Sequence, residues 1–219
     1  MRRPVVRVDE THYVDVSDLV TDFNEEFFGA AGIARLAGPV AERVTTGDVH
    51  QFGDQRIGAP IARPHQILGV GLNFSDHAAE TGQPVPSEPI LFTKSPNTLV
   101  GPNDDVRIPR GSTKPDWDVE LGIVIDSRAS YLGSPAHARA AIAGYVLVND
   151  VSERAFQLQR GGQWTKGKSA ETFNPAGPWL ATPDAIPDIH DLDMWLDVTV
   201  IELGIGRPGR ARQHVIGPR

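Results

Sequence analysis

The sequence predicts a mainly β fold with short helices, of the α+β class. The 219 residues include 22 glycines and 18 prolines, which mark turns and favour short elements over a helical bundle. Between these turn residues lie several short segments that are apolar or that alternate between polar and apolar residues, as β-strands do. Helical spacing is confined to a few short stretches.

The composition limits the classes of function. A formal net charge of −7 and a pI of about 5.4 argue against nucleic-acid binding, which needs a basic surface. The absence of cysteine excludes disulfides, thiolate nucleophiles and cysteine metal sites. No stretch has the apolar length of a signal-peptide core or a membrane span. We therefore expect a cytoplasmic protein that binds neither nucleic acid nor a membrane.

Two domains are expected. Residues 1–60 predict a small N-terminal domain, in which residues 13–16 alternate like a strand and residues 18–36 have helical spacing that glycine interrupts twice. Prolines and glycines then mark a linker, and residues 61–219 form the main domain.

The main domain is predicted to consist of strands separated by short helices. Ser134 and Pro135 occupy the favoured cap and first-turn positions of a helix, and Gly144 is expected to end it. In chain order the predicted elements are strands at 67–71 and 90–94 with a short helix ending near Gly82 between them, a strand at 116–125, the helix from Ser134, a buried strand at 145–150, a helix through Gln159, a loop at 161–177 and further strands to residue 200.

The strand at residues 116–125 carries the clearest chemical signal. Strand side chains alternate between faces, so Asp116, Asp118 and Glu120 are expected to share one face. Neighbouring carboxylates repel one another, and a hard divalent cation with carboxylate ligands would relieve that repulsion. A polar strand edge that faces water is the simpler interpretation of this pattern taken alone.

A second polar group follows the buried strand at residues 145–150. Asp150, Arg154 and Gln157 recur at helical spacing and are predicted to line one helix face. An acid, an arginine and an amide suit a site for a metal and an anionic ligand, whereas the alternative is a solvated face with an Asp150–Arg154 ion pair. The loop that follows carries Lys166 and Lys168, and loop lysines are usually solvated.

Taken together, these motifs resemble the signature of a known family. The segments GLNFSDHAAE at 71–80, LFTK at 91–94, DWDVEL at 116–121, NDVSER at 149–154 and GKS at 167–169 occur in this order. The set resembles the fumarylacetoacetate hydrolase family, over roughly residues 67–200. The stretch from 161 to 179 is similar to the bacterial branch of diketo-deoxy-sugar-acid hydrolases and hydroxyheptadienedioate isomerases.

The resemblance implies a mixed β-roll catalytic domain, a small N-terminal domain and a homodimer. It also implies one Mg²⁺ or Mn²⁺ per site, held by Asp118, Glu120 and Asp150, and no organic cofactor. The family's first ligand is usually Glu, so Asp118 is one methylene shorter. The remaining implied roles are water activation by His77 and Glu80, charge stabilisation by Lys168, and substrate contacts from Lys94, Arg154 and Gln157.

These roles predict a metal-dependent hydrolase that cleaves a C–C bond in a 2,4-dioxo acid. The metal would chelate the oxo acid, His77 would take a proton from water, and the departing fragment would be an enolate. An isomerase or decarboxylase of a dienedioate-like or oxaloacetate-like acid would use the same enolate without attack by water. A family member that binds metal without catalysis is a third hypothesis.

The C-terminal segment departs from the family pattern. The apolar alternation reverses phase between Val200 and Ile201, and no turn residue lies at the reversal. A β-bulge would explain the reversal. The resemblance suggests instead that a block of strands, including a Gly-Thr-Pro segment that lines the active site in the family, is absent from this chain near that junction.

Overall fold

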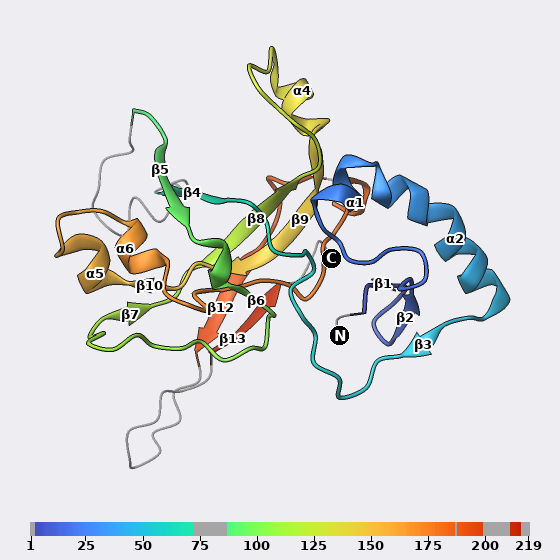
Figure 1. The fold of residues 1–219 in the computed structure, drawn as a ribbon, viewed down its shortest axis with the longest axis horizontal. Coiled ribbons are helices and arrows are strands. Elements are labelled where there is room, and N and C mark those ends of the chain that lie inside the picture. The colour runs from blue at the N-terminus through green and yellow to red at the C-terminus, as the bar shows by residue number, and fades with distance from the viewer. Residues whose placement is uncertain (1–2, 72–86, 187, 199–210, 216–219) are drawn as a thin grey trace.

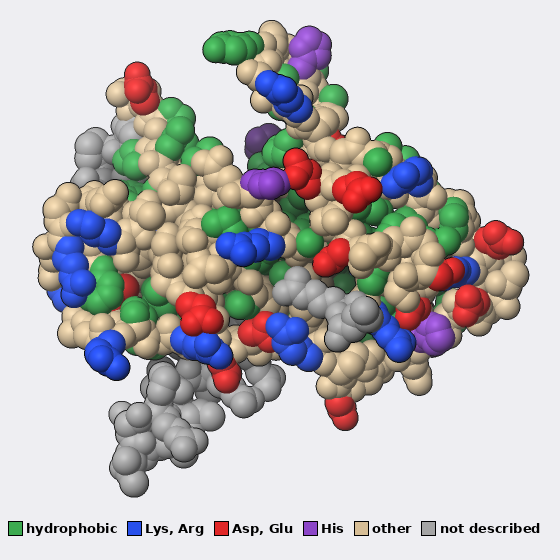
Figure 2. All heavy atoms as spheres, viewed as in Figure 1, with side chains coloured by type: hydrophobic (Ala, Val, Ile, Leu, Met, Phe, Trp, Pro, Cys, Tyr) green, Lys and Arg blue, Asp and Glu red, His purple; other side chains and the backbone are tan. Residues whose placement is uncertain are grey.

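The computed structural model describes residues 3–71, 87–186, 188–198 and 211–215 (Figure 1). Strands outnumber helices in these segments, which agrees with the predicted fold class. No helix among the described residues is long and apolar enough to cross a membrane. On the face shown in Figure 2, basic and acidic side chains are interspersed.

The N-terminal part contains an antiparallel sheet and two helices. The sheet has the order β1-β2-β3, with β1 at Val5–Arg7, β2 at His12–Asp15 and β3 at His50–Gln51. The helices are α1, Glu25–Gly29, and α2, Gly32–Thr46, so the predicted helical segment is interrupted between its two glycines and extends ten residues beyond its expected end.

The main hydrophobic core joins the N-terminal part to the rest of the chain. It combines apolar side chains in and just after β2 and in α1 and α2 with Ala143 of β9 (Ile142–Asn149), and Val124 of β8 (Val119–Ile125) packs against it. This core contains residues from both sides of residue 60, and the domain boundary expected there stays a prediction. The buried residues of this core are Val14, Val16, Phe27, Phe28, Leu36 and Ala143.

Among the described residues after β3, the strands form two-stranded ladders. Four are antiparallel and the β6–β11 ladder is parallel. The pairs are β4, Ile67–Gly71, with β5, Ile90–Lys94; β6, Leu99–Val100, with β11, Asn174–Pro175; β7, Pro115–Asp116, with β10, Ser152–Glu153; β8, Val119–Ile125, with β9, Ile142–Asn149; and β12, Met194–Val198, with β13, Ala211–Val215.

Short helices connect these ladders. In Figure 1 the β8–β9 pair runs through the centre, with α4 beyond one end, α1 and α2 on one side, and β5, α5 and α6 on the other. The helical elements are η1, Pro96–Thr98; α4, Pro135–Arg139; α5, Arg154–Leu158; α6, Thr165–Lys168; and η2, Pro183–Ala185.

The helix predicted from Ser134 begins where expected but ends early. The Ser134 side chain accepts a hydrogen bond from the His137 backbone N–H at 3.3 Å, which confirms the cap. The helix ends at Arg139 instead of Gly144, because Gly144 belongs to β9. A Cβ on Gly144 would lie 2.4 Å from the Ala181 carbonyl oxygen, so glycine is required there by a close backbone approach.

Two further predictions were wrong in detail. The strand at 116–125 is interrupted at residues 117–118, because β7 pairs with β10 whereas β8 pairs with β9. The segment after Asp150 is not helical at once: β10 precedes α5, and α5 ends at Leu158. The two interruptions lie side by side, because the backbone N–H of Asp150 donates to the carbonyl of Asp118.

Candidate active site

Two of the predicted metal ligands lie where the ladders are interrupted. Asp118 is between β7 and β8, and Asp150 is between β9 and β10. The backbone N–H of Asp150 donates to the carbonyl of Asp118 at 2.9 Å, so the two residues stay adjacent although neither belongs to a strand. Glu120 is the second residue of β8.

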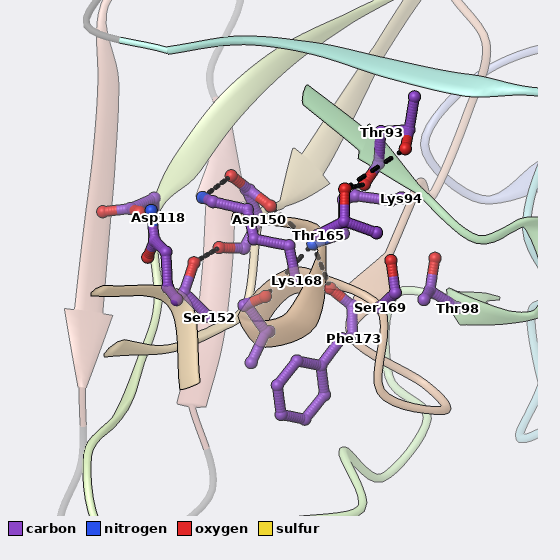
Figure 3. Close-up of polar contacts among 12 residues, drawn as sticks. Thr93, Lys94, Thr98, Asp118, Asp150, Ser152, Thr165, Lys168, Ser169 and Phe173 are labelled. Carbon is purple, nitrogen blue, oxygen red and sulfur yellow. Dashed lines mark hydrogen bonds and ion pairs between the residues drawn. The ribbon is translucent and has the colours of Figure 1, made fainter. Parts of the chain in front are cut away.

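Asp150 is buried between two lysine side chains (Figure 3). Lys94, at the end of β5, donates to one carboxylate oxygen at 2.5 Å, and Lys168, at the end of α6, donates to the other. Both lysines are 3% exposed and Asp150 is 5% exposed. The Lys94 ammonium also donates to the carbonyls of Val151 and Phe173, at 3.1 and 2.7 Å, which completes its hydrogen bonding.

Burial and ion pairing oppose each other at these groups. Burial lowers the pKa of Lys94 to about 8, against the opposing attraction of Asp150. Burial alone would raise the pKa of Asp150, but the ammonium groups of Lys94 and Lys168 outweigh it and lower that pKa. The Asp150 carboxylate is therefore ionised near neutral pH.

Glu120 brings a third carboxylate into the same electrostatic environment. Burial, followed by repulsion from Asp150 and Asp118, raises the pKa of Glu120 to about 7. The predicted ligands therefore lie close enough to interact through their charges. A divalent cation would relieve this repulsion, and an all-oxygen donor set suits Mg²⁺ or Mn²⁺.

The donor chemistry therefore fits the predicted metal, but the side chains are engaged elsewhere. In the part of the chain that the structure describes, no three His, Asp or Glu side chains are grouped to hold a metal ion. Asp118 pairs with Arg154, and Asp150 pairs with the two lysines. The three-carboxylate metal site stays a prediction.

Arg154 connects the two acids of the interrupted strand. Its Nε donates to Asp116 at 2.7 Å, one terminal nitrogen donates to Asp118 at 2.6 Å, and the other donates to Gln157 at 3.0 Å. Burial works against the charge of Arg154, but Asp118 and Asp116 outweigh it and raise its pKa. Arg154 and Gln157 therefore do lie together, whereas the Asp150–Arg154 ion pair considered from the sequence does not form.

Lys168 was predicted to lie in a loop, where lysines are usually solvated, but the structure places it in a helix and buries it. A short helix, α6, holds it, and α6 is attached to β5 by side-chain hydrogen bonds to the backbone. The Thr165 hydroxyl donates to the Thr93 carbonyl at 3.1 Å, and the Ser95 N–H donates to the Ser169 hydroxyl at 3.1 Å. Lys166, in contrast, is on the exposed side and donates to a backbone carbonyl.

Two aromatic residues near Lys168 were not identified from the sequence. The Lys168 ammonium is 4.6 Å from the ring centroid of Phe92, a cation–π distance, and Trp164 packs against Phe92 at 5.7 Å. Gly69 and Gly71 of β4 make room for the two rings, because a Cβ at either position would overlap a ring. Phe92 lies within the LFTK motif and Trp164 lies three residues before the GKS motif, and this proximity was the available signal.

A buried glutamate was also missed. Glu153 has no exposed surface, and its carboxylate accepts hydrogen bonds from the Ser112 hydroxyl and from the backbone N–H groups of Lys114 and Ala155. Burial would raise its pKa, but these hydrogen bonds outweigh it and lower the pKa. An acid just before a helix is a recognisable cap signal.

The remaining predicted residues, His77 and Glu80, lie outside the described residues, as does the Val200–Ile201 junction. The other predicted site residues form two adjoining groups. One group contains Lys94, Asp150 and Lys168, and the other contains Asp118, Arg154 and Gln157. Glu120 is repelled by one acid of each group, Asp150 and Asp118.

Comparison with known proteins supports the family resemblance. The family model described as "Fumarylacetoacetate (FAA) hydrolase C-terminal" matches residues 66–213. A Burkholderia multivorans protein named "Putative hydrolase" is 48% identical over 184 residues, a match that covers 84% of this chain and 64% of the relative. This chain thus spans less than two thirds of that relative's length.

Solved structures agree with the fold. A fumarylacetoacetate hydrolase from Exiguobacterium antarcticum superposes with a TM-score of 0.65 at 30% identity, covering 80% of this chain and 61% of that one. A 2-hydroxyhepta-2,4-diene-1,7-dioate isomerase from Mycobacterium marinum superposes with a TM-score of 0.56 at 32% identity, covering 77% and 55%. The chain has the fold predicted for it and belongs to the fumarylacetoacetate hydrolase family.

Proposed function

We propose that the protein is a divalent-metal-dependent hydrolase that cleaves a C–C bond in a 2,4-dioxo acid, such as an acylpyruvate or a diketo-deoxy sugar acid. The observation that carries this proposal is the buried Lys94–Asp150–Lys168 group beside Glu120 and Asp118. Buried charged groups of this kind are costly and are concentrated at functional sites. Membership of a family with hydrolases supports the same class.

The metal would be held by Asp118, Glu120 and Asp150. A bound Mg²⁺ or Mn²⁺ supplies Lewis acidity and a template for the carboxylate and 2-oxo group of the substrate. The acidic side chains must exchange their present partners for it. Arg154 would then lose Asp118 but keep Asp116, so its released terminal nitrogen could pair with the substrate carboxylate. Gln157, 2% exposed and already bonded to Arg154, would orient that guanidinium.

The remaining residues would move protons and stabilise charge. His77, oriented by Glu80, would take a proton from water, and the resulting hydroxide would add to the distal carbonyl of the substrate. The Lys168 ammonium would stabilise the negative charge on that carbonyl oxygen. The C–C bond would then break, and the 2-oxo acid fragment would leave as an enolate that takes up a proton. Lys94 would hold Asp150 in place and add positive charge.

An isomerase or decarboxylase of a dienedioate-like or oxaloacetate-like acid is the second candidate. The similarity to the Mycobacterium marinum isomerase favours it, and the same cationic groups would stabilise its enolate. A family member that binds metal without catalysis is a third candidate, which the shorter Asp118 and its ion pair with Arg154 favour. A homodimer in the cell cytoplasm is proposed for all three.

A substrate screen tests the proposal. Acylpyruvates, diketo-deoxy sugar acids and oxaloacetate are incubated with the protein and Mg²⁺ or Mn²⁺, and pyruvate release is followed with a coupled dehydrogenase. We expect release that EDTA abolishes and that added metal restores. Asp118→Asn should abolish this release, whereas Glu171→Gln, on an exposed ion pair with Arg107, should not change it.

The His77→Ala variant separates the candidates. Loss of hydrolysis together with retention of tautomerisation, followed by ultraviolet absorbance, would favour the isomerase. Absence of turnover on all substrates in the metal-loaded wild type would exclude the hydrolase proposal and leave the non-catalytic candidate, which metal binding by calorimetry then tests.

A further inference from the structure

We infer that Glu153 is a positioning residue that sets the place of the Arg154 guanidinium and thereby the affinity of the site for the carboxylate of its substrate. The inference rests on the proposed function for its substrate, but the geometry behind it is independent of that function. The Glu153 carboxylate bonds to Ser112, Lys114 and Ala155, and it is not expected to touch the substrate.

The first observation is the completeness of the hydrogen bonding around a fully buried carboxylate. Glu153 has no exposed surface. One of its oxygens accepts from the Ser112 hydroxyl and from the Lys114 N–H at 3.0 Å, and the other accepts from the Ala155 N–H at 3.0 Å. The two backbone N–H groups can only donate, and the Ser112 hydroxyl donates in this arrangement, so an ionised carboxylate suits the position better than a neutral side chain.

The hydrogen bonds of Glu153 connect two separate elements, β7 and α5. Ser112 and Lys114 precede β7, whereas Ala155 is in the first turn of α5. The Glu153 carboxylate therefore holds the start of β7 against the start of α5. Two backbone contacts join the same two segments. The β7–β10 ladder pairs Glu153 with Pro115, and the Arg154 N–H donates to the Lys114 carbonyl at 2.9 Å.

The consequence concerns the two acids that hold the Arg154 side chain. Asp116 is the second residue of β7, opposite Ser152 in the ladder, and Asp118 follows two residues later. Arg154 bonds to both, at 2.7 and 2.6 Å. A shift of β7 relative to α5 would separate the guanidinium from one or both carboxylates, so its position depends on the contacts of Glu153.

A substitution that keeps the shape of Glu153 exposes this dependence. In Glu153→Gln the side chain keeps one acceptor oxygen, but its amide group directs N–H donors at the existing donors. The Ser112 hydroxyl can rotate to accept from this amide, but the N–H of Lys114 or of Ala155 cannot, so one of these two backbone groups must move away. The movement would fall on β7 and α5, the two elements that carry the Arg154 contacts. Ser112→Ala removes one hydrogen bond and leaves the carboxylate ionised, so it is the milder variant.

The kinetic test is a double-mutant cycle on a substrate found in the screen above. We expect Glu153→Gln to raise KM about 10-fold and to change kcat by less than about twofold, because misplacing a binding group weakens binding before it affects bond cleavage. In an Arg154→Lys background the same change should raise KM by no more than about twofold, because the residue through which it acts is already altered. Glu171→Gln serves as the control and should match wild type.

A spectroscopic test makes the inference independent of turnover. The Nε–H of Arg154 donates to Asp116 and should give a hydrogen-exchange-protected ¹⁵N resonance, which Arg154→Lys removes and thereby assigns. We expect this resonance to lose protection in Glu153→Gln, and to lose part of it in Ser112→Ala if Glu153→Gln does not fold. An inactive wild type with this loss would refute only the proposed function.

Two results would overturn the inference. One is an Arg154 resonance that remains protected in both variants. The other is an active enzyme in which the effects of Glu153→Gln and Arg154→Lys on KM multiply independently, or in which kcat falls while KM is unchanged. Either would reduce Glu153 to a residue that stabilises the fold without acting through Arg154.

Discussion

Replacing Glu120 by glutamine should stabilise the metal-free protein above neutral pH, although it removes a predicted metal ligand. The ionised Glu120 carboxylate is unfavourable in the fold because it is half-buried and is repelled by Asp150 and Asp118. Glutamine has nearly the same shape and no charge. The variant therefore removes the repulsion without opening a cavity.

The magnitude follows from the pKa. The pKa of Glu120 rises from 4.5 to about 7 on folding, and each tenfold change in acidity corresponds to about 1.4 kcal/mol. The ceiling is about 3.4 kcal/mol, which solvent screening at the exposed part of the side chain reduces to about 1–3 kcal/mol. Because the folded pKa is the higher one, the favourable contribution is complete below pH 4.5 and is lost as pH rises through about 7.

The assay is urea unfolding of wild type and Glu120→Gln between pH 4.5 and 8.5, with EDTA present. The two free energies of unfolding should coincide at the acid end, and the variant should gain stability as pH rises. Adding Mg²⁺ should stabilise wild type more than the variant. A difference that does not change with pH, or a variant that is less stable at pH 8, would show that Glu120 is not repelled as described.

Two further predictions concern the packing around the same site. Lys94→Met should lower the free energy of unfolding by about 3–5 kcal/mol at pH 7, because Asp150 loses a buried partner; a loss below 1 kcal/mol in a urea titration would contradict this pairing. Gly167→Ala should cost about 1–3 kcal/mol, because its Cβ would lie 2.5 Å from the Glu153 carbonyl oxygen. Gly38→Ala is the matched control, because Gly38 lies in α2 with open space around it, and this variant should raise the free energy of unfolding by about 0.5–1 kcal/mol. Equal melting temperatures for the two variants would show that α6 can shift freely.

The sequence was most informative where a local signal was sufficient. The strands at residues 67–71 and 90–94 have the predicted bounds, because short apolar runs between turn residues have few alternatives. The Ser134 cap was also predictable from adjacent residues. The family could be recognised because the motifs occur in a fixed order, which requires no knowledge of their contacts.

The site was predictable as a set of residues but not as a set of contacts. Sequence spacing placed Asp150 beside Arg154, whereas in the structure Asp150 bonds to Lys94 and Lys168, 56 and 18 residues away. The same spacing could not show that Glu153 faces residues 112–114, about 40 positions earlier. Hydrogen-bond partners of this kind depend on which strands pair, and strand pairing is a non-local property.

The sequence by itself determined the alternation, the turn residues and the kinds of charged group that the site can contain. Only the tertiary structure decided where the alternation stops. Residues 117–118 leave the strand because β7 and β8 pair with different partners. The strand that precedes Asp150 ends beside this break, where the Asp150 N–H bonds to the Asp118 carbonyl. Lys168 is buried for a similar reason, since α6 is attached to β5 by contacts with residues more than 70 positions away. Burial of a charged side chain depends on what packs over it, and those neighbours come from distant parts of the chain.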